Sequence, residues 1–544
     1  MARRAEDPSC PEVDRRHSRR RRSRLVPAQT LEPCYHNSWH RPGVKKAVLT
    51  GVLSAGIALA PSGHADARKT AAGAAAAGAR ADATKNAVTE PARPVLELPF
   101  EKVKLENGLT LILHRDPSLP MVAVNIWYHV GPAYEPPGRS GFAHLFEHLM
   151  FEGSRHIGHE FDQLLEAAGA TNVNGTTNWD RTDYFETVPR EYLELALWIE
   201  SDRMGYLLDA ITQERLDVQR DVVKNERRQT FENAPYGKSS LTLLDTMFPA
   251  GHPYHGAVIG SMQDLSAATL DDVKDFFRSY YAPSNATLCL AGDFDPALAK
   301  ALVEKYFGTL HGRQPARLAQ KATPPLTQSV RLVVDEPVDL VRVAYGWIAP
   351  PAYGPDDAPL DLATTILAGG RSTRLYRKLV VEEKLASEVE ASSDPNALAT
   401  MLDVSATAAS GKAPEEIEKA LDGVIEGLKT TPPTAEELAR AKRRTFLEIA
   451  SDLEQLNGHS GESGRAGLLQ RFDHYLGDPG YLPKWIAAID AVTAEDISRV
   501  VQKYMSRDAR VTVITRPTTA AQSAPAAAAP NAPAAPKAAG KVKP

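Results

Sequence analysis

The chain has 544 residues, enough for two or three domains with cores of their own. Hydrophobic residues make up 43% and charged residues 24% of it, which is typical of a soluble globular protein and argues against a largely disordered chain. The formal net charge of −5 gives no general attraction to polyanions, so we predict no nucleic-acid binding.

The N-terminal part has the pattern of an export signal. A basic pair at residues 45–46 precedes an apolar run at 47–60, and Ala-Asp-Ala follows at 65–67. This order predicts a secretory signal peptide cleaved after Ala67. The apolar run is too short for a stable membrane anchor. We expect an exported protein, periplasmic or alternatively secreted, with residues 1–67 forming an N-terminal extension and signal peptide.

The composition of the remaining chain indicates two domains, a linker between them, and non-globular segments at both ends. Residues 68–94 are rich in Ala, Gly, Thr and Lys and predict a flexible tether, whereas the Ala/Pro-rich residues 517–544 predict a disordered tail. A Pro-containing linker at 314–327 separates a first domain, 95–313, from a second, 328–516.

In the first domain, strand and helix patterns are interleaved. Strands are expected at 100–113 (two strands around a turn at Asn107-Gly108), 121–130, 172–188 (one or two strands) and 286–292. Helices are expected at 140–152 with Ser140 as its cap, 161–168, 191–207, 212–231, 270–281 and 296–306.

The second domain repeats this mixture. Strands are expected at 329–334, 341–347 and 510–514, and helices at 356–367, 374–383, 413–429, 435–452 and 493–504. Mixed order of this kind predicts the α+β class, with two similar domains in which a mixed or antiparallel sheet packs with helices.

The helix at 140–152 has two separable faces. Apolar residues at helical spacing predict a core face of Phe142, Leu145, Phe146 and Leu149. His144, Glu147 and His148 lie on another face, where two imidazoles at i and i+4 can reach one metal ion. Zinc is the metal that such ligands favour, and Glu147 is placed to accept a proton from water. The alternative is a solvated polar face.

A catalytic zinc site needs a third protein ligand. The helix at 212–231 offers Glu226, which shares a face with Gln219, Val222 and Val223. The alternative for Glu226 is an ordinary surface carboxylate, because Lys and Arg residues surround it.

With these residues in place, the chain resembles the pitrilysin-type (M16, inverzincin) zinc metallopeptidases. That family includes insulin-degrading enzymes and mitochondrial processing peptidases. The resemblance rests on H-x-x-E-H at 144–148, a distant glutamate within 219–227, and the runs Tyr-Tyr-Ala-Pro at 280–283 and Gly-Asp-Phe at 292–294. Within the family it resembles the catalytic (beta) subunit type of the processing peptidases and the bacterial periplasmic relatives.

The resemblance implies a zinc-dependent endopeptidase that holds one zinc ion per chain. Its ligands would be His144, His148 and Glu226, and Glu147 would be the general base. The stretch Asn174-Gly175-Thr176 takes the place of the edge strand to which an extended peptide adds as a further β-strand. The two domains would form one half of a clamshell around the peptide.

The chain departs from the family pattern at three positions. Gln219 replaces a second glutamate beside the metal site, and Val380 and Ser387 stand where an Arg/Tyr pair grips the substrate. We therefore predict the catalytic half of a two-subunit clamshell, whose partner is a non-zinc homologue carrying the Arg/Tyr pair. A homodimer is the alternative assembly. A zinc-retaining scaffold or peptide-binding subunit without activity is the alternative function.

Other histidines and a cysteine could carry chemistry, but their positions in the sequence favour a structural role. The histidines at 156–159 lie beyond the expected end of a helix, and a proline interrupts those at 252–255. Cys289 lies in an apolar strand and is interpreted as a small buried hydrophobe.

Overall fold

The computed structural model describes residues 96–158, 161–312, 315 and 323–518. The predicted signal peptide and tether, and nearly all of the predicted tail, lie outside these residues. The proposed domain boundaries therefore stay predictions. No helix in the described part of the chain is both long and apolar enough to cross a membrane.

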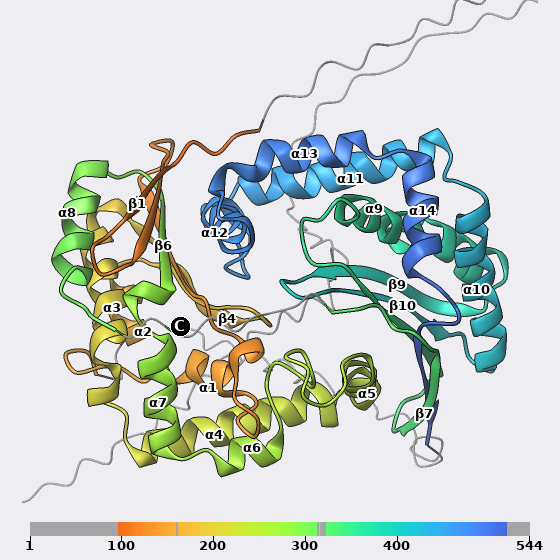
Figure 1. Cartoon of the computed structure of the whole chain (residues 1–544), viewed down its shortest axis with the longest axis horizontal. Coiled ribbons are helices and arrows are strands. Elements are labelled where there is room, and N and C mark those ends of the chain that lie inside the picture. The colour runs from red at the N-terminus through yellow and green to blue at the C-terminus, as the bar shows by residue number, and fades with distance from the viewer. Residues whose placement is uncertain (1–95, 159–160, 313–314, 316–322, 519–544) are drawn as a thin grey trace, which may run out of the picture. The chain divides into compact units, whose positions relative to one another are not determined.

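The first sheet has six strands in the order β1-β2-β6-β3-β5-β4 (Figure 1). Its strands are β1 (Glu101–Lys104), β2 (Thr110–Arg115), β3 (Met121–Tyr128), β4 (Thr171–Thr177), β5 (Thr182–Pro189) and β6 (Ala286–Gly292). The β2–β6 pair is parallel and the others are antiparallel, so the sheet is mixed, as expected. Strand β4 lies at a free edge of the sheet.

Helices of the first half pack against this sheet and against one another. They are α1 (Phe142–Leu149), α2 (Phe161–Ala167), α3 (Leu193–Tyr206), α4 (Gln213–Arg227), α6 (Met262–Ala267), α7 (Leu270–Tyr280) and α8 (Pro296–Phe307). Helix α1 contacts β4 and β5 on one side and α4 on the other. This position sets the side chains of α1 between the edge of the sheet and α4.

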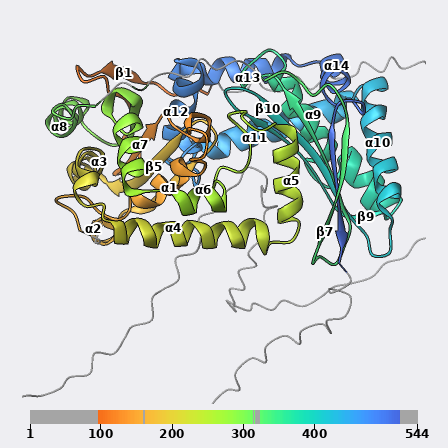
Figure 2. The same ribbon diagram turned by 60° about the horizontal axis from the view of Figure 1, so that its bottom comes forward.

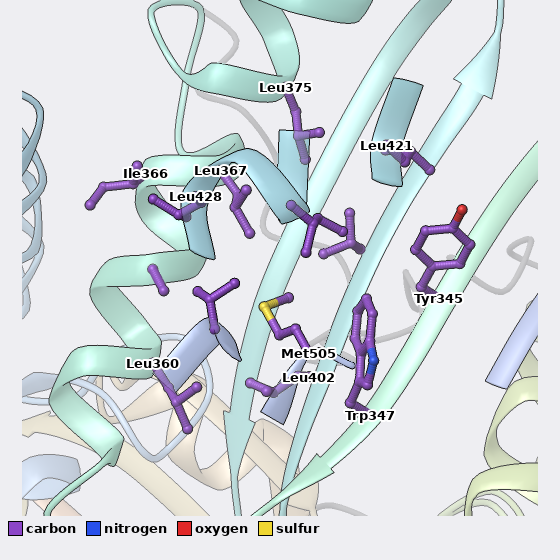
Figure 3. Packing of buried hydrophobic residues seen from close by; sticks show 14 of the residues in the cluster. Tyr345, Trp347, Leu360, Ile366, Leu367, Leu375, Leu402, Leu421, Leu428 and Met505 are labelled. Atoms are coloured by element: carbon purple, nitrogen blue, oxygen red, sulfur yellow. The ribbon is translucent and has the colours of Figure 1, made fainter. Parts of the chain in front are cut away.

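The second sheet has five strands in the order β7-β11-β8-β10-β9. They are β7 (Val330–Glu336), β8 (Arg342–Ala349), β9 (Ala386–Pro395), β10 (Thr400–Ala408) and β11 (Val511–Pro517), with β7 and β11 parallel. Helices α9 (Asp357–Ala368), α10 (Pro414–Thr430) and α14 (Ala494–Tyr504) bury one face, where Trp347 and Leu402 meet Leu367 and Leu428 (Figure 3). Helices α11 (Ala435–Leu453) and α13 (Leu482–Ala491) complete this half. Both sheets thus confirm the predicted α+β class.

Each sheet also contacts a helix contributed by the other half. Helix α5 (Gly237–Met247) packs on the second sheet (Figure 2). Leu243 and Met247 share a buried cluster with Ile348 and Val513. Helix α12 (Gly464–Leu476) packs on β3 and β6 of the first sheet (Figure 1). All described residues accordingly fall in one compact unit. Neither helix was predicted, and the β9–β10 hairpin, α6 and α13 were also missed.

Three expected helices differ from the sequence-based interpretation. The helix predicted over 212–231 is α-helical only to Arg227, and a π-helix, η4 (Arg228–Glu232), follows it. The helix predicted over 140–152 is shorter, because it starts at Phe142 after Gly141, and Ser140 binds Asp264 instead of capping it. The helix predicted over 374–383 contains a π-helix, η6 (Tyr376–Glu382).

Asp403 in β10 makes stability depend on pH. Burial and the nearby carboxylates of Glu390 and Asp394 raise its pKa to about 7 from an ordinary value of 3.8, although Ser392 donates a hydrogen bond to it. The folded state therefore holds this proton more tightly than the unfolded state does. The stabilising contribution of protonated Asp403 is fully present below about pH 4 and is lost as the pH rises through about 7.

Asp403→Asn is expected to raise the free energy of unfolding at pH 8 by roughly 1–3 kcal/mol, because the amide stays neutral. Denaturant melts of both proteins at pH 4 and pH 8 measure this difference. It should be near zero at pH 4. A variant that is less stable than wild type at pH 8 would contradict the prediction.

Candidate metal centre

The N-terminus of α1 is anchored by a carboxylate that sequence reasoning did not identify. Glu135 accepts hydrogen bonds from the N–H groups of Gly141 (2.9 Å) and Ala143 (2.7 Å), at the end of the helix where negative charge is favourable. Gly141 has φ of 89°, and a Cβ there would lie 2.5 Å from the carbonyl oxygen of Ile259, so only glycine fits. Burial raises the pKa of Glu135 to about 7.

The predicted core face of α1 is confirmed. Phe142, Leu145, Phe146 and Leu149 are at most 1% exposed, and the Phe146 ring stacks on Phe276. The Tyr184 hydroxyl of β5 donates a hydrogen bond to the carbonyl of Phe146 at 3.0 Å. The helix is therefore fixed in rotation, and its polar face is turned towards α4.

Helix α4 brings Glu226 to the two histidines. Glu226 Oε1 lies 3.5 Å from His144 Nε2, and Glu226 Oε2 lies 3.0 Å from His148 Nε2. One ligand atom from each residue falls within 4.8 Å of the others, and across the described ranges no second group of this kind occurs. Packing of α4 buries Leu216 and Val223, whereas Val222, expected on the Glu226 face, is exposed.

The donor set fits a divalent metal ion of the zinc type. Two imidazole nitrogens and one carboxylate converge on one point, as in three-ligand catalytic sites. His144 Nδ1 is buried without a hydrogen-bond partner, and the other ring nitrogen, Nε2, faces Glu226. The residues fit a zinc ion, and their role as its ligands stays a prediction.

Without a metal, the carboxylates of this cluster favour the protonated form of His144. Burial by itself would lower the pKa of His144, but the carboxylates of Glu226 and Glu147 raise it to about 9. Burial would likewise raise the pKa of Glu226, but His144 and His148 hold it well below its usual range. A site that favours positive charge this strongly suits a cation, with which the proton competes.

Glu147 lies beside the three converging residues. Its Oε2 is 4.0 Å from His144 Nε2, and the Thr177 hydroxyl of β4 donates a hydrogen bond to the same oxygen at 2.6 Å. Glu147 is only about one-eighth exposed. The carboxylate is therefore next to the metal position and is fixed by the edge strand.

The predicted substrate residues lie on β4, the free edge of the first sheet. A Cβ at Gly175 would lie 3.2 Å from the Phe151 ring and 3.1 Å from the Tyr184 ring, so the position favours glycine. The polar groups of Thr176 are already engaged, because its N–H and hydroxyl bond to Asp183 and its carbonyl accepts from Arg181. Main-chain pairing with a substrate would therefore rely on Asn174 and Gly175, and their role stays a prediction.

The edge strand is also held by a loop of the second half that sequence reasoning missed. Arg181, which is buried beside Asp183, forms an ion pair with the partly exposed Glu462 of that loop, and Thr176 donates a hydrogen bond to the carbonyl of Ser460. In the Thr176–Ser460 and Arg181–Glu462 contacts the two residues lie some 280 positions apart, so no local sequence pattern could reveal these contacts.

The three positions that depart from the family pattern have structural partners. The Gln219 amide donates a hydrogen bond to Glu152. Val380 packs against the core of the second half, and the Ser387 hydroxyl donates to the carbonyl of Thr407 at 3.2 Å.

The residues set aside as structural have ordinary contacts. His156 bonds to Asp202, His252 to Thr323 and His255 to the carbonyl of Phe248. His159 lies outside the described residues. Cys289 is a free buried thiol in β6, as predicted, and burial raises its pKa.

Known proteins share both a family model and the fold with this chain. Residues 110–248 match the family model described as Insulinase (Peptidase family M16), and residues 267–445 match the one described as Peptidase M16 inactive domain. The chain belongs to the M16 peptidase family of zinc proteases.

Individual M16 relatives cover most of the described region. Zinc protease PqqE of Helicobacter pylori is 29% identical over 430 residues, which span 77% of this chain and 93% of that protein. The crystal structure of a protease from Helicobacter pylori superposes with a TM-score of 0.72 at 27% identity, covering 78% of this chain and all of the other. The periplasmic protease PqqL of Escherichia coli shares the fold at 18% identity with a TM-score of 0.62, and only 49% of its chain is covered.

Proposed function

We propose that this M16 protein is a zinc-dependent endopeptidase that cleaves extended peptides or unfolded polypeptide segments. The observation that carries the proposal is the convergence of His144, His148 and Glu226 beside the carboxylate of Glu147. A zinc ion, when bound there, would polarise a water molecule and make it more acidic.

The chain's own residues supply positioning and proton transfer. Glu147 would accept the proton of the attacking water and return it to the leaving amine. The free edge of β4 would align the peptide main chain through Asn174 and Gly175, which makes recognition depend little on the substrate's side chains. One zinc ion per chain is the stoichiometry that this single cluster supports.

Removal of the metal tests the proposed function. A chelator is expected to abolish cleavage of an unstructured fluorescent peptide, and added Zn²⁺ should restore it. A tightly folded protein of the same composition should resist cleavage, because it cannot add a strand to β4. Cleavage that survives complete removal of the metal would contradict the proposal.

We further propose that this chain is the catalytic half of a two-subunit clamshell. Val380 and Ser387 supply neither the guanidinium nor the phenol of the family's substrate-gripping pair, and both have structural contacts. The match of this chain to half of the longer Escherichia coli protein favours the same division. The partner would be a homologous chain without H-x-x-E-H that carries the Arg/Tyr pair, and a homodimer is the alternative.

Activity in relation to assembly tests the two-subunit proposal. The purified chain alone is expected to cleave slowly, and a homologue carrying the Arg/Tyr pair should raise the rate at least tenfold in a one-to-one complex. Light scattering identifies the species that is active. Full activity as a monomer would contradict the proposal, and an active homodimer would favour the alternative. Zinc binding without turnover in any assembly would favour a scaffold or peptide-binding role.

Export to the periplasm is the location we propose. It rests on the predicted signal peptide at residues 45–67 and on the periplasmic location of the Escherichia coli protein that shares the fold.

A further inference from the structure

Thr177 joins the edge strand to the candidate base. It is the last residue of β4, and its hydroxyl donates a 2.6 Å hydrogen bond to Glu147 Oε2. No other described residue donates a hydrogen bond to this carboxylate. The position of Glu147 therefore depends on a side chain of the strand that the substrate is proposed to extend.

The alternation of side chains along β4 separates two roles. Thr176 points to the face where Asp183 and the loop carbonyl of Ser460 bind it. Thr177 points to the opposite face, towards α1, because neighbouring residues of a strand alternate. Two adjacent threonines thus perform different tasks: Thr176 fixes the strand to the second half, and Thr177 fixes the carboxylate of Glu147.

We propose that Thr177 is a positioning residue that holds Glu147 in the orientation needed for proton transfer. Its hydroxyl donates to Oε2, the oxygen that lies 4.0 Å from His144 Nε2, so this bond fixes the carboxylate beside the proposed metal ligands. Hydrogen bonds to charged groups are stronger than neutral ones, so one hydroxyl is enough to select the side-chain rotamer. The proposal rests on the proposed peptidase function and adds a residue to its machinery.

Three variants separate this role from packing. Thr177→Val keeps the shape and removes the hydroxyl, and it is expected to lower kcat about tenfold while KM stays within twofold. Thr177→Ser restores a hydroxyl and should recover most of the rate. Thr187→Val is the matched control, because Thr187 is also a threonine of this sheet and its buried hydroxyl has no hydrogen-bond partner.

A double-variant comparison and crystal structures test the positioning role in other ways. In the Glu147→Gln background, Thr177→Val is expected to have no additional effect on the residual rate, because Thr177 would act only through a carboxylate base that this variant lacks. Crystal structures of the metal-free proteins should show the Glu147 carboxylate displaced in Thr177→Val and retained in Thr177→Ser. The zinc content and melting temperature of all variants should match wild type.

The outcomes distinguish this inference from the proposed function. An unchanged kcat and an undisplaced Glu147 in Thr177→Val would overturn the positioning role while leaving the peptidase function intact. Equal loss in the wild-type and Glu147→Gln backgrounds, or loss of zinc, would overturn it as well. If Glu147→Gln is itself as active as wild type, Glu147 is not the base and the inference fails, whereas the peptidase function is tested separately by removal of the metal.

Discussion

Glu147→Gln is expected to lower kcat by about three orders of magnitude and to leave zinc binding unchanged. The amide keeps the shape and can accept a hydrogen bond from Thr177, but it cannot take up a proton. General-base catalysis contributes about 10²–10⁴-fold in typical enzymes, which sets the size of the expected loss. The measurements are peptide cleavage and metal content on the same preparation.

An exposed carboxylate provides the control. Glu214 lies in the first turn of α4, on the helix that carries Glu226, and Glu214→Gln should cleave as fast as wild type. Wild-type activity of Glu147→Gln would remove Glu147 from the mechanism. Loss of zinc from this variant would assign Glu147 to the metal instead of to proton transfer.

Glu226→Gln is expected to lose both zinc and activity. The substitution replaces an anionic ligand with a neutral amide between two histidines, so a divalent cation loses its charge partner. Mutation of a residue that supports a metal ligand typically lowers metal affinity about 10–100-fold, and loss of a ligand itself should lower it further. Competition with a chromogenic zinc chelator measures the affinity.

The same change has an effect that needs no metal. Glu226 and Glu147 raise the pKa of His144 to about 9 in the metal-free chain, and without the Glu226 carboxylate the pKa of His144 should fall. Titration of the imidazole by NMR detects the shift. If Glu226→Gln keeps wild-type zinc affinity, another residue completes the site, and Glu226 is a surface carboxylate close to the histidines.

The grouping of His144, Glu147 and His148 on one helix face could be predicted because it follows from local spacing. Helical spacing alone places His144, Glu147 and His148 on one face, and an amphipathic pattern places Glu226 on a second helix. The structure brings these residues together. What the sequence could not supply is the anchor of α1, because Glu135 lies in a loop and its acceptors are main-chain N–H groups.

Helices α5 and α12, each of which packs on the sheet of the other half, were not predicted for a different reason. Helix α5 contains Gly, Ser and Thr residues, and α12 contains two glycines, so both have low helix propensity. Their stability comes from packing on a sheet of the other half, where Met247 and Leu469 are fully buried. The Thr177–Glu147 contact is non-local in the same way, since it depends on how β4 meets α1.

The most direct test of the metal centre is anomalous X-ray diffraction at the zinc absorption edge from crystals of the zinc-loaded chain. We expect one peak within bonding distance of His144 Nε2, His148 Nε2 and a Glu226 carboxylate oxygen, with the Glu147 carboxylate adjacent to it. A peak at His156 or His252 instead, or no peak at this cluster with zinc in excess, would contradict the proposed metal site.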